Sequence, residues 1–208
     1  FNDDGSVTSF PGSSIPLATL GAFILWIGWF GFNGGSQLAL GSALDSVAIS
    51  NIFINTNLAA AAGVMFAMIT SQILFGKVDI VTALNGAIGG LVAITAEPLA
   101  PSIGAAVFIG GVGGILVALS TPLLLKMKID DVVGAIPAHL VCGIWGTMIV
   151  PLTNGDASYF GQFMGVISVA IFAFIASFIT WTVLKYTLGL RVTAVSYTHL
   201  RAHETLSY

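Results

Sequence analysis

His139 is the residue of this sequence whose chemistry is hardest to explain by packing alone. It lies in the apolar stretch "DDVVGAIPAHLVCGIWGTMIV", eight residues after Asp131, which corresponds to about 12 Å along a helix. An ionisable side chain this deep in an apolar segment is costly to desolvate and is therefore a candidate functional site. A neutral imidazole can pass a proton or a hydrogen bond within a narrow apolar passage. The alternative is a neutral histidine that is hydrogen-bonded to another helix.

The residues around His139 predict how its helix is built. Pro137 removes a backbone donor and predicts locally irregular helix, which is tolerated at membrane depth where it is buried in protein or lines a cavity. Asp130 and Asp131 open the helix at its cytoplasmic side and favour capping of its positive N-terminal end. Cys142 is the single cysteine of the chain and is interpreted as a packing residue. One histidine and one cysteine are too few for an intramembrane enzyme, so we predict neither catalysis nor a metal site.

A second candidate site lies in "FILWIGWFGFNGGSQLALGS", residues 23–42. Steps of three and four residues place Trp29, Phe32, Asn33 and Ser36 on one helix face. Aromatic rings next to a hydroxyl can hold a small cation, because the cation–π attraction contributes about 0.5–2 kcal/mol. The alternative is a belt of aromatic residues at the membrane interface.

The composition predicts the elements that carry these residues. The 208 residues are 56% hydrophobic and 7% charged, with a mean hydropathy of +0.99, whereas soluble domains have about 25% charged residues. Continuous apolar runs exclude the short alternating strands of a membrane β-barrel. We therefore predict an all-α polytopic membrane protein, since a span needs about 20 residues. The expected spans are 17–36, 46–75, 80–96, 101–125, 131–151 and 159–184.

The basic residues predict the orientation of these spans. Threading six spans places every lysine and arginine on one side of the membrane, which should be the cytoplasmic side. The opposite loops carry Asp45, Glu97 and Asp156 and no basic residue. Both ends of the chain are then expected in the cytoplasm. The six basic residues are Lys77, Lys126, Lys128, Lys185, Arg191 and Arg201.

The 25 glycines cluster within the spans. Gly110 and Gly114 form a small-xxx-small pair, which permits close helix packing in lipid. We interpret most of these glycines as packing residues, and the alternative is that a few leave room beside a conduit.

The two ends of the chain differ from the apolar part. Residues 1–16 have no initiator methionine and are interpreted as a cytoplasmic loop in a longer protein, before a transmembrane region at 17–192. Residues 193–208, "TAVSYTHLRAHETLSY", are interpreted as a non-native tail and set aside. His199 and His203 have i, i+4 spacing, but two ligands are a weak metal signal.

Three motifs together resemble the ammonium transporters of the Amt/Mep/Rh family, and more closely its bacterial Amt branch. They are "LGAFILWIGWFGFNGGS", "NGAIGGLVAITAEP" and "DDVVGAIPAHLVCGIWGT". The resemblance implies eleven membrane helices in two inverted halves, a homotrimer, and a conduit through each subunit. The six transmembrane helices expected here resemble helices six to eleven of that fold.

The resemblance also implies roles for individual residues. Phe32 resembles the phenylalanine gate below an outer ammonium site, and Ser36 resembles the hydroxyl that binds ammonium there. Trp29 is similar to a tryptophan that lines the conduit lower down. Thr95 resembles a threonine near the pore centre, and His139 resembles the second of a pair of pore histidines. The first histidine and the aromatic partners of the outer site belong to helices outside this chain.

The family mechanism implied by the resemblance is ammonium transport without a cofactor. Ammonium is recruited at the outer mouth, loses its proton and passes the histidines as ammonia. Asp131 resembles an acid at the start of helix ten, and Leu140 stands where many relatives have glycine. Further implications are a bacterial inner-membrane location and contact with a PII signalling protein. The alternative function is that of an ammonium sensor, which some family members have.

Overall fold

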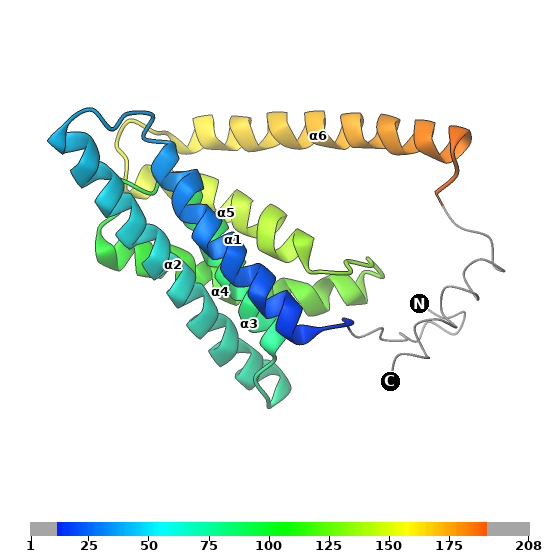
Figure 1. The fold of residues 1–208 in the computed structure, drawn as a ribbon. Coiled ribbons are helices and arrows are strands. Elements are labelled where there is room, and N and C mark those ends of the chain that lie inside the picture. Colours follow the sequence, from blue (N-terminus) through cyan, green and yellow to red (C-terminus); the bar gives the residue numbers. More distant parts are fainter. Residues whose placement is uncertain (1–11, 191–208) are drawn as a thin grey trace. The chain divides into compact units, whose positions relative to one another are not determined.

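The computed structural model describes residues 12–190, and every regular element within that range is a helix (Figure 1). The chain divides into two units, the second of which begins at Met164. The elements in chain order are α1 (Ile15–Gly35), α2 (Ala43–Phe75), α3 (Ile80–Thr95), α4 (Ile103–Lys126), the π-helix η1 (Ile136–Val141), α5 (Cys142–Ile149), the 3₁₀ turn η2 (Val150–Leu152) and α6 (Tyr159–Thr187).

Polar capping residues set most helix ends. The Ser14 hydroxyl accepts a hydrogen bond from the Leu17 N–H and begins α1. Ser42 and Asp45 form a reciprocal capping box at the start of α2, which satisfies two backbone donors. Gly76 ends α2 in the left-handed conformation, with φ +71°, which glycine adopts at little cost. Five of the six predicted helices agree with the structure to within three residues at each end.

The prediction for the fifth span was wrong at its start. The helix was expected to begin at Asp131, but helical structure begins at Ile136 and its first six residues form a π-helix. Gly134 has φ +77°, which no regular right-handed helix contains. His139 is thus the fourth residue of η1, and its depth cannot be counted from Asp131. The irregular helix expected at Pro137 is confirmed as a π-helix.

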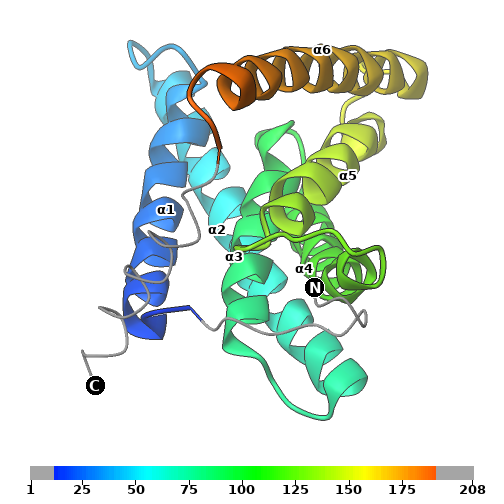
Figure 2. The same ribbon diagram turned by 90° about the vertical axis from the view of Figure 1, so that its right-hand side faces the viewer.

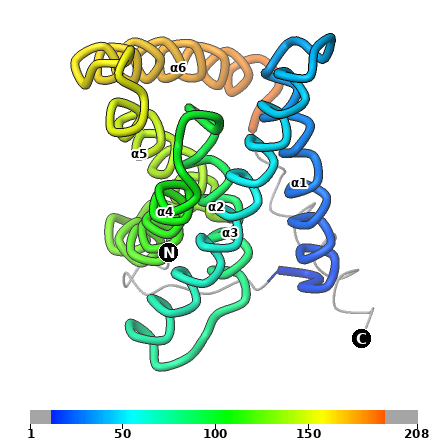
Figure 3. The backbone as a smooth tube through the Cα atoms, turned by 90° about the vertical axis from the view of Figure 1, so that its left-hand side faces the viewer, coloured from blue at the N-terminus to red at the C-terminus, as the bar shows by residue number. Residues whose placement is uncertain are grey.

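Helices α2, α3 and α4 pack against one another (Figure 3), and glycines lie at these contacts. A Cβ atom at Gly110 would overlap the Ala59 carbonyl oxygen, and one at Gly114 would overlap the Gly63 carbonyl oxygen. In lipid, such close backbone approach is a main source of helix association. The packing interpretation of this glycine pair is therefore confirmed. Helix α3 also contacts α1, η1 and α5, so it lies among the other helices of the first unit (Figure 2).

Four helices of residues 12–190 are long and apolar enough to cross a membrane, namely α1, α2, α4 and α6. Two further apolar segments are shorter: α3 has 16 residues, and η1, α5 and η2 together cover Ile136–Leu152. The predicted all-α membrane architecture is confirmed. The described residues of α6 include no buried side chain.

Candidate functional site

A hydrogen bond between Trp29 and Thr95 joins two predicted site residues that are 66 positions apart. The Trp29 indole Nε1–H donates to Thr95 Oγ1 over 2.7 Å. The Thr95 hydroxyl donates in turn to the Leu91 carbonyl oxygen over 2.6 Å. Both side chains are half-buried. Each polar hydrogen of the two side chains has a partner within the protein, so the orientation of the indole ring relative to α3 is fixed. The surface formed by Trp29 and Thr95, called the apolar wall below, therefore has no free hydrogen-bond donor.

Phe32 lies next to Trp29 at the end of α1. The two ring centroids are 6.0 Å apart and the rings are inclined by 56°. Phe32 is 62% exposed, whereas Asn33 is 1% exposed and donates to Thr56 Oγ1 of α2 over 3.0 Å. Asn33 was expected on the same helix face as Phe32, but its side chain is buried and its amide connects α1 to α2.

Ser36 is exposed at the C-terminal end of α1. Its hydroxyl donates to the Phe32 carbonyl oxygen over 2.7 Å. A hydroxyl has one proton and two lone pairs, so the Ser36 oxygen can still accept a hydrogen bond from a donor outside the helix. The site therefore pairs an exposed ring with a hydroxyl acceptor one turn away.

His139 is exposed, whereas Ala138 and Cys142 on the same helical segment are buried. These two buried residues belong to a cluster with Leu91 of α3, against which Trp29 also packs. The turn that carries His139 and the indole of Trp29 are thus joined through one set of core residues. The imidazole lies outside that core, on the exposed side of the segment.

The Asp131 carboxylate binds the start of the helical segment that carries His139. One oxygen accepts hydrogen bonds from the N–H groups of Gly134 at 3.1 Å and Ala135 at 2.9 Å. The other accepts from the Ile136 N–H at 2.7 Å. Three backbone donors at the start of the helical segment are thus satisfied by one side chain, which gives Asp131 the capping role expected from the sequence.

Replacing Asp131 with alanine leaves these three donors without a partner. We expect the free energy of unfolding of this segment to fall by about 1–3 kcal/mol, the usual effect of losing hydrogen bonds to a charged group. Hydrogen exchange at Gly134, Ala135 and Ile136 measures the change. The exposed neighbour Asp130 is the matched control, because Asp130→Ala should leave exchange at these amides unchanged. Equal protection in both variants contradicts the capping role.

The polar contacts of the loop between α3 and α4 were not predicted. Glu97 accepts from the Leu99 and Ala100 N–H groups with one oxygen and from Asn154 Nδ2 at 2.8 Å with the other. Asn55 Nδ2 donates to the carbonyl oxygens of Pro98 and Pro101. The acid and prolines of "TAEPLAPS" signalled a loop, but partners more than 40 positions away carry no local sequence signal. In residues 12–190 no group of three His, Cys, Asp or Glu side chains could hold a metal ion.

Comparisons with known proteins agree on one family. The Ammonium Transporter Family matches residues 2–205. The chain is 42% identical to ammonium transporter Amt2 of Archaeoglobus fulgidus over 76% of its length, which is 33% of that relative. It is 35% identical to Amt1 of the same organism over 94% of its length, or 52% of that relative. The chain therefore spans about half of these relatives or less.

Solved structures give the same result for the fold. A structure titled Sensor Amt Protein superimposes with a TM-score of 0.85 and 35% identity, over 93% of this chain and 49% of the neighbour. Candida albicans Mep2 superimposes with a TM-score of 0.80 and 26% identity, over 90% of this chain and 45% of the neighbour. The six helices described here thus correspond to about half of a larger helical fold.

Proposed function

Because the chain belongs to the ammonium transporter family, we propose that the complete protein moves ammonium across a membrane through a conduit that this chain lines in part. The Trp29–Thr95 hydrogen bond carries the proposal, since it brings α1 and α3 together beside the turn that bears His139. The proposed conduit residues are Trp29, Phe32, Ser36, Thr95 and His139, and Asp131 supports the last of them.

Recruitment takes place at the exposed end of α1. The Phe32 ring offers its negative face to a cation, and the Ser36 oxygen, whose proton is already donated to Phe32, accepts a hydrogen bond from an ammonium N–H. Both interactions are open to a cation from solution because both side chains are exposed.

The apolar wall formed by Trp29 and Thr95 favours deprotonation of ammonium beyond Phe32. The Trp29 and Thr95 donors are both occupied, and the cluster behind them is apolar. An unpaired charge in such surroundings is heavily penalised, so the neutral form of an ionisable group prevails. Ammonium can give its proton to the neutral His139 imidazole, which then holds the N–H, and continue as ammonia, whereas potassium has no proton to give. The ability to become neutral by losing a proton is therefore the basis of the selectivity.

The proposal extends to assembly and location. We expect a homotrimer in a bacterial inner membrane, with both ends of this segment in the cytoplasm, as the lysine and arginine distribution indicates. A PII signalling protein is the expected regulatory partner on that side. These features rest on the family resemblance and the charge pattern.

Proteoliposomes of the complete protein test the proposal. An inward ammonium gradient should produce ammonium-dependent uptake or current, and the same gradient of potassium should not. A second function, ammonium sensing, is favoured by the match to the structure titled Sensor Amt Protein. Saturable ammonium binding without any flux would support the sensor and contradict the transporter.

Replacing Ser36 with alanine removes the acceptor at the outer mouth. We expect the ammonium concentration for half-maximal uptake to rise about five- to tenfold, because one hydrogen bond of ordinary strength contributes about 1 kcal/mol or slightly more. The maximal rate should change little, since the apolar wall is intact. Ser46→Ala is a matched control, because Ser46 is also exposed and bonds within its own helix start. Identical half-saturation in the two variants excludes Ser36 from recruitment.

A further inference from the structure

Asn85 of α3 holds the loop that leads into the helix of His139. This half-buried side chain donates a hydrogen bond from Nδ2 to the Val133 carbonyl oxygen over 3.0 Å, across 48 positions of sequence. The next residue, Gly134, has φ +77°, and a Cβ atom there would overlap Asn85 Nδ2. The amide thus lies directly against the backbone at Val133 and Gly134, and only glycine permits this approach.

The contact continues through the backbone to His139. Asp131 binds the N–H groups of Gly134, Ala135 and Ile136, and the Gly134 carbonyl oxygen accepts from the Ala138 N–H at 3.1 Å. Pro137 supplies no N–H of its own. The turn that carries His139 therefore begins on a loop whose carbonyl is held by Asn85 and whose amides are held by Asp131.

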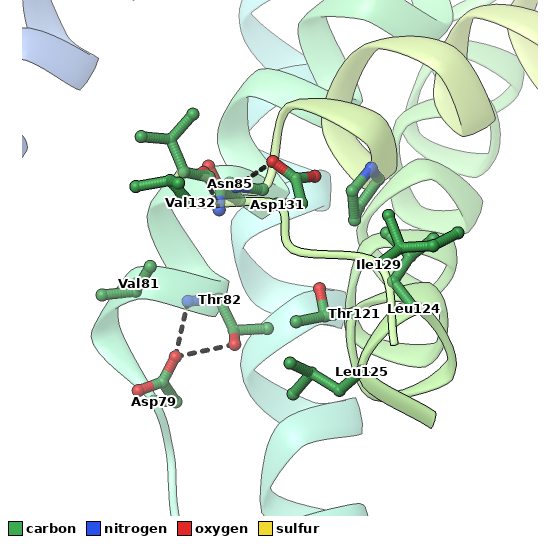
Figure 4. A pocket seen from close by; sticks show the side chains of 13 residues that line it. Asp79, Val81, Thr82, Asn85, Thr121, Leu124, Leu125, Ile129, Asp131 and Val132 are labelled. Carbon is green, nitrogen blue, oxygen red and sulfur yellow. Dashed lines mark hydrogen bonds between the residues drawn. The ribbon is translucent and has the colours of Figure 1, made fainter. Parts of the chain in front are cut away.

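Packing alone does not hold this loop in place. A cavity of about 220 Å³ lies beside it, lined among others by Thr82, Thr121, Asp131 and Val132 (Figure 4). Val132 and Val133 are exposed in the segment described. With open space on one side, the loop has room to shift relative to α3, and the hydrogen bond from Asn85 is the directional contact that joins the loop to that helix.

We propose that Asn85 is a positioning residue for His139: its amide holds the loop at Val133 and Gly134, and so sets where the imidazole meets the permeating molecule. This inference rests on the proposed transport function. Asn85 itself does not touch the permeating molecule, and the loss of its donor acts through the backbone between Val133 and His139.

Two substitutions in the complete protein, reconstituted in liposomes, separate the donor from the bulk of the side chain. Asn85→Leu keeps a branched side chain of similar size but has no donor. Asn85→Gln keeps the amide, and the cavity beside the loop can take the extra methylene. Thr121→Val is the matched control, because Thr121 lines the same cavity but bonds only to Val117 in its own helix.

We expect Asn85→Leu to lower ammonium uptake per folded protein about tenfold. Loss of one hydrogen bond shifts the equilibrium between the held and the shifted position of the loop by about this factor. The substitution should also raise the ratio of potassium to ammonium flux severalfold, which a mere loss of folded protein would not do. Asn85→Gln should recover at least half of the wild-type uptake, and Thr121→Val should match wild type.

Three results overturn the inference. They are wild-type uptake and ion ratio in Asn85→Leu, equal losses in the Leu and Gln variants, and a loss in Thr121→Val as large as that in Asn85→Leu. If the unaltered protein carries no ammonium flux, that result contradicts the proposed transport function. It is distinct from the three results above, which concern Asn85 alone.

Discussion

Replacing His139 with alanine in the complete protein is expected to abolish ammonium transport, with a loss of roughly a hundredfold or more, the effect of removing a group that relays protons. The imidazole is exposed, while its neighbours Ala138 and Cys142 carry the packing of the helix. The substitution therefore removes the chemistry and leaves the core contacts in place. Ammonium-dependent current in proteoliposomes, normalised to the amount of assembled protein, measures the effect.

Leu140 provides the control for this experiment. It follows His139 on the same π-helix and is also exposed, so Leu140→Ala tests whether any truncation at this turn reduces transport. We expect Leu140→Ala to stay within about twofold of wild type, as for most exposed substitutions. Unchanged current and ion selectivity in His139→Ala would remove His139 from the mechanism.

The second large effect is expected at Gly110 in α4. A single methyl group there meets the backbone of Ala59, so Gly110→Ala forces α2 and α4 apart. We expect a loss of about 1–3 kcal/mol in the free energy of unfolding, the usual range for overpacking a tight interface. Thermal unfolding in detergent or lipid should show a lower midpoint and less assembled protein.

Gly104 of the same helix is the matched control. A Cβ atom at Gly104 meets nothing within 4 Å, and alanine has the higher helix propensity. Gly104→Ala should therefore be neutral or slightly stabilising. A midpoint for Gly110→Ala equal to that of Gly104→Ala would show that the close approach of α2 and α4 does not limit stability.

The sequence predicted the helices well because their ends are determined locally. Ser14, Ser42 and Asp79 each cap the helix that follows them, and such caps are recognisable from a few residues. The start of the fifth helix was misjudged because Asp131 caps it from five residues away, across a loop that contains Gly134. An aspartate close to a helix start does not by itself reveal how many residues intervene.

The candidate site was predictable only as a set of residues. Trp29, Thr95 and His139 were selected by their motifs, but the hydrogen bond from Trp29 to Thr95 depends on how α1 and α3 cross. Asn85 was overlooked because its partner is a backbone carbonyl oxygen. Every residue has one, so no residue type in the sequence indicates this contact. Contacts between a side chain and a distant backbone group can be found only in three dimensions.

The short length of α3 has a consequence for permeation energetics. Its 16 residues extend about 24 Å, against a hydrocarbon thickness of about 30 Å, and the segment bearing His139, Ile136–Leu152, is also short. Neither segment is long enough to span the hydrocarbon core by itself. In the proposed conduit, a permeating molecule would therefore have to remain uncharged over less than the full width of the membrane.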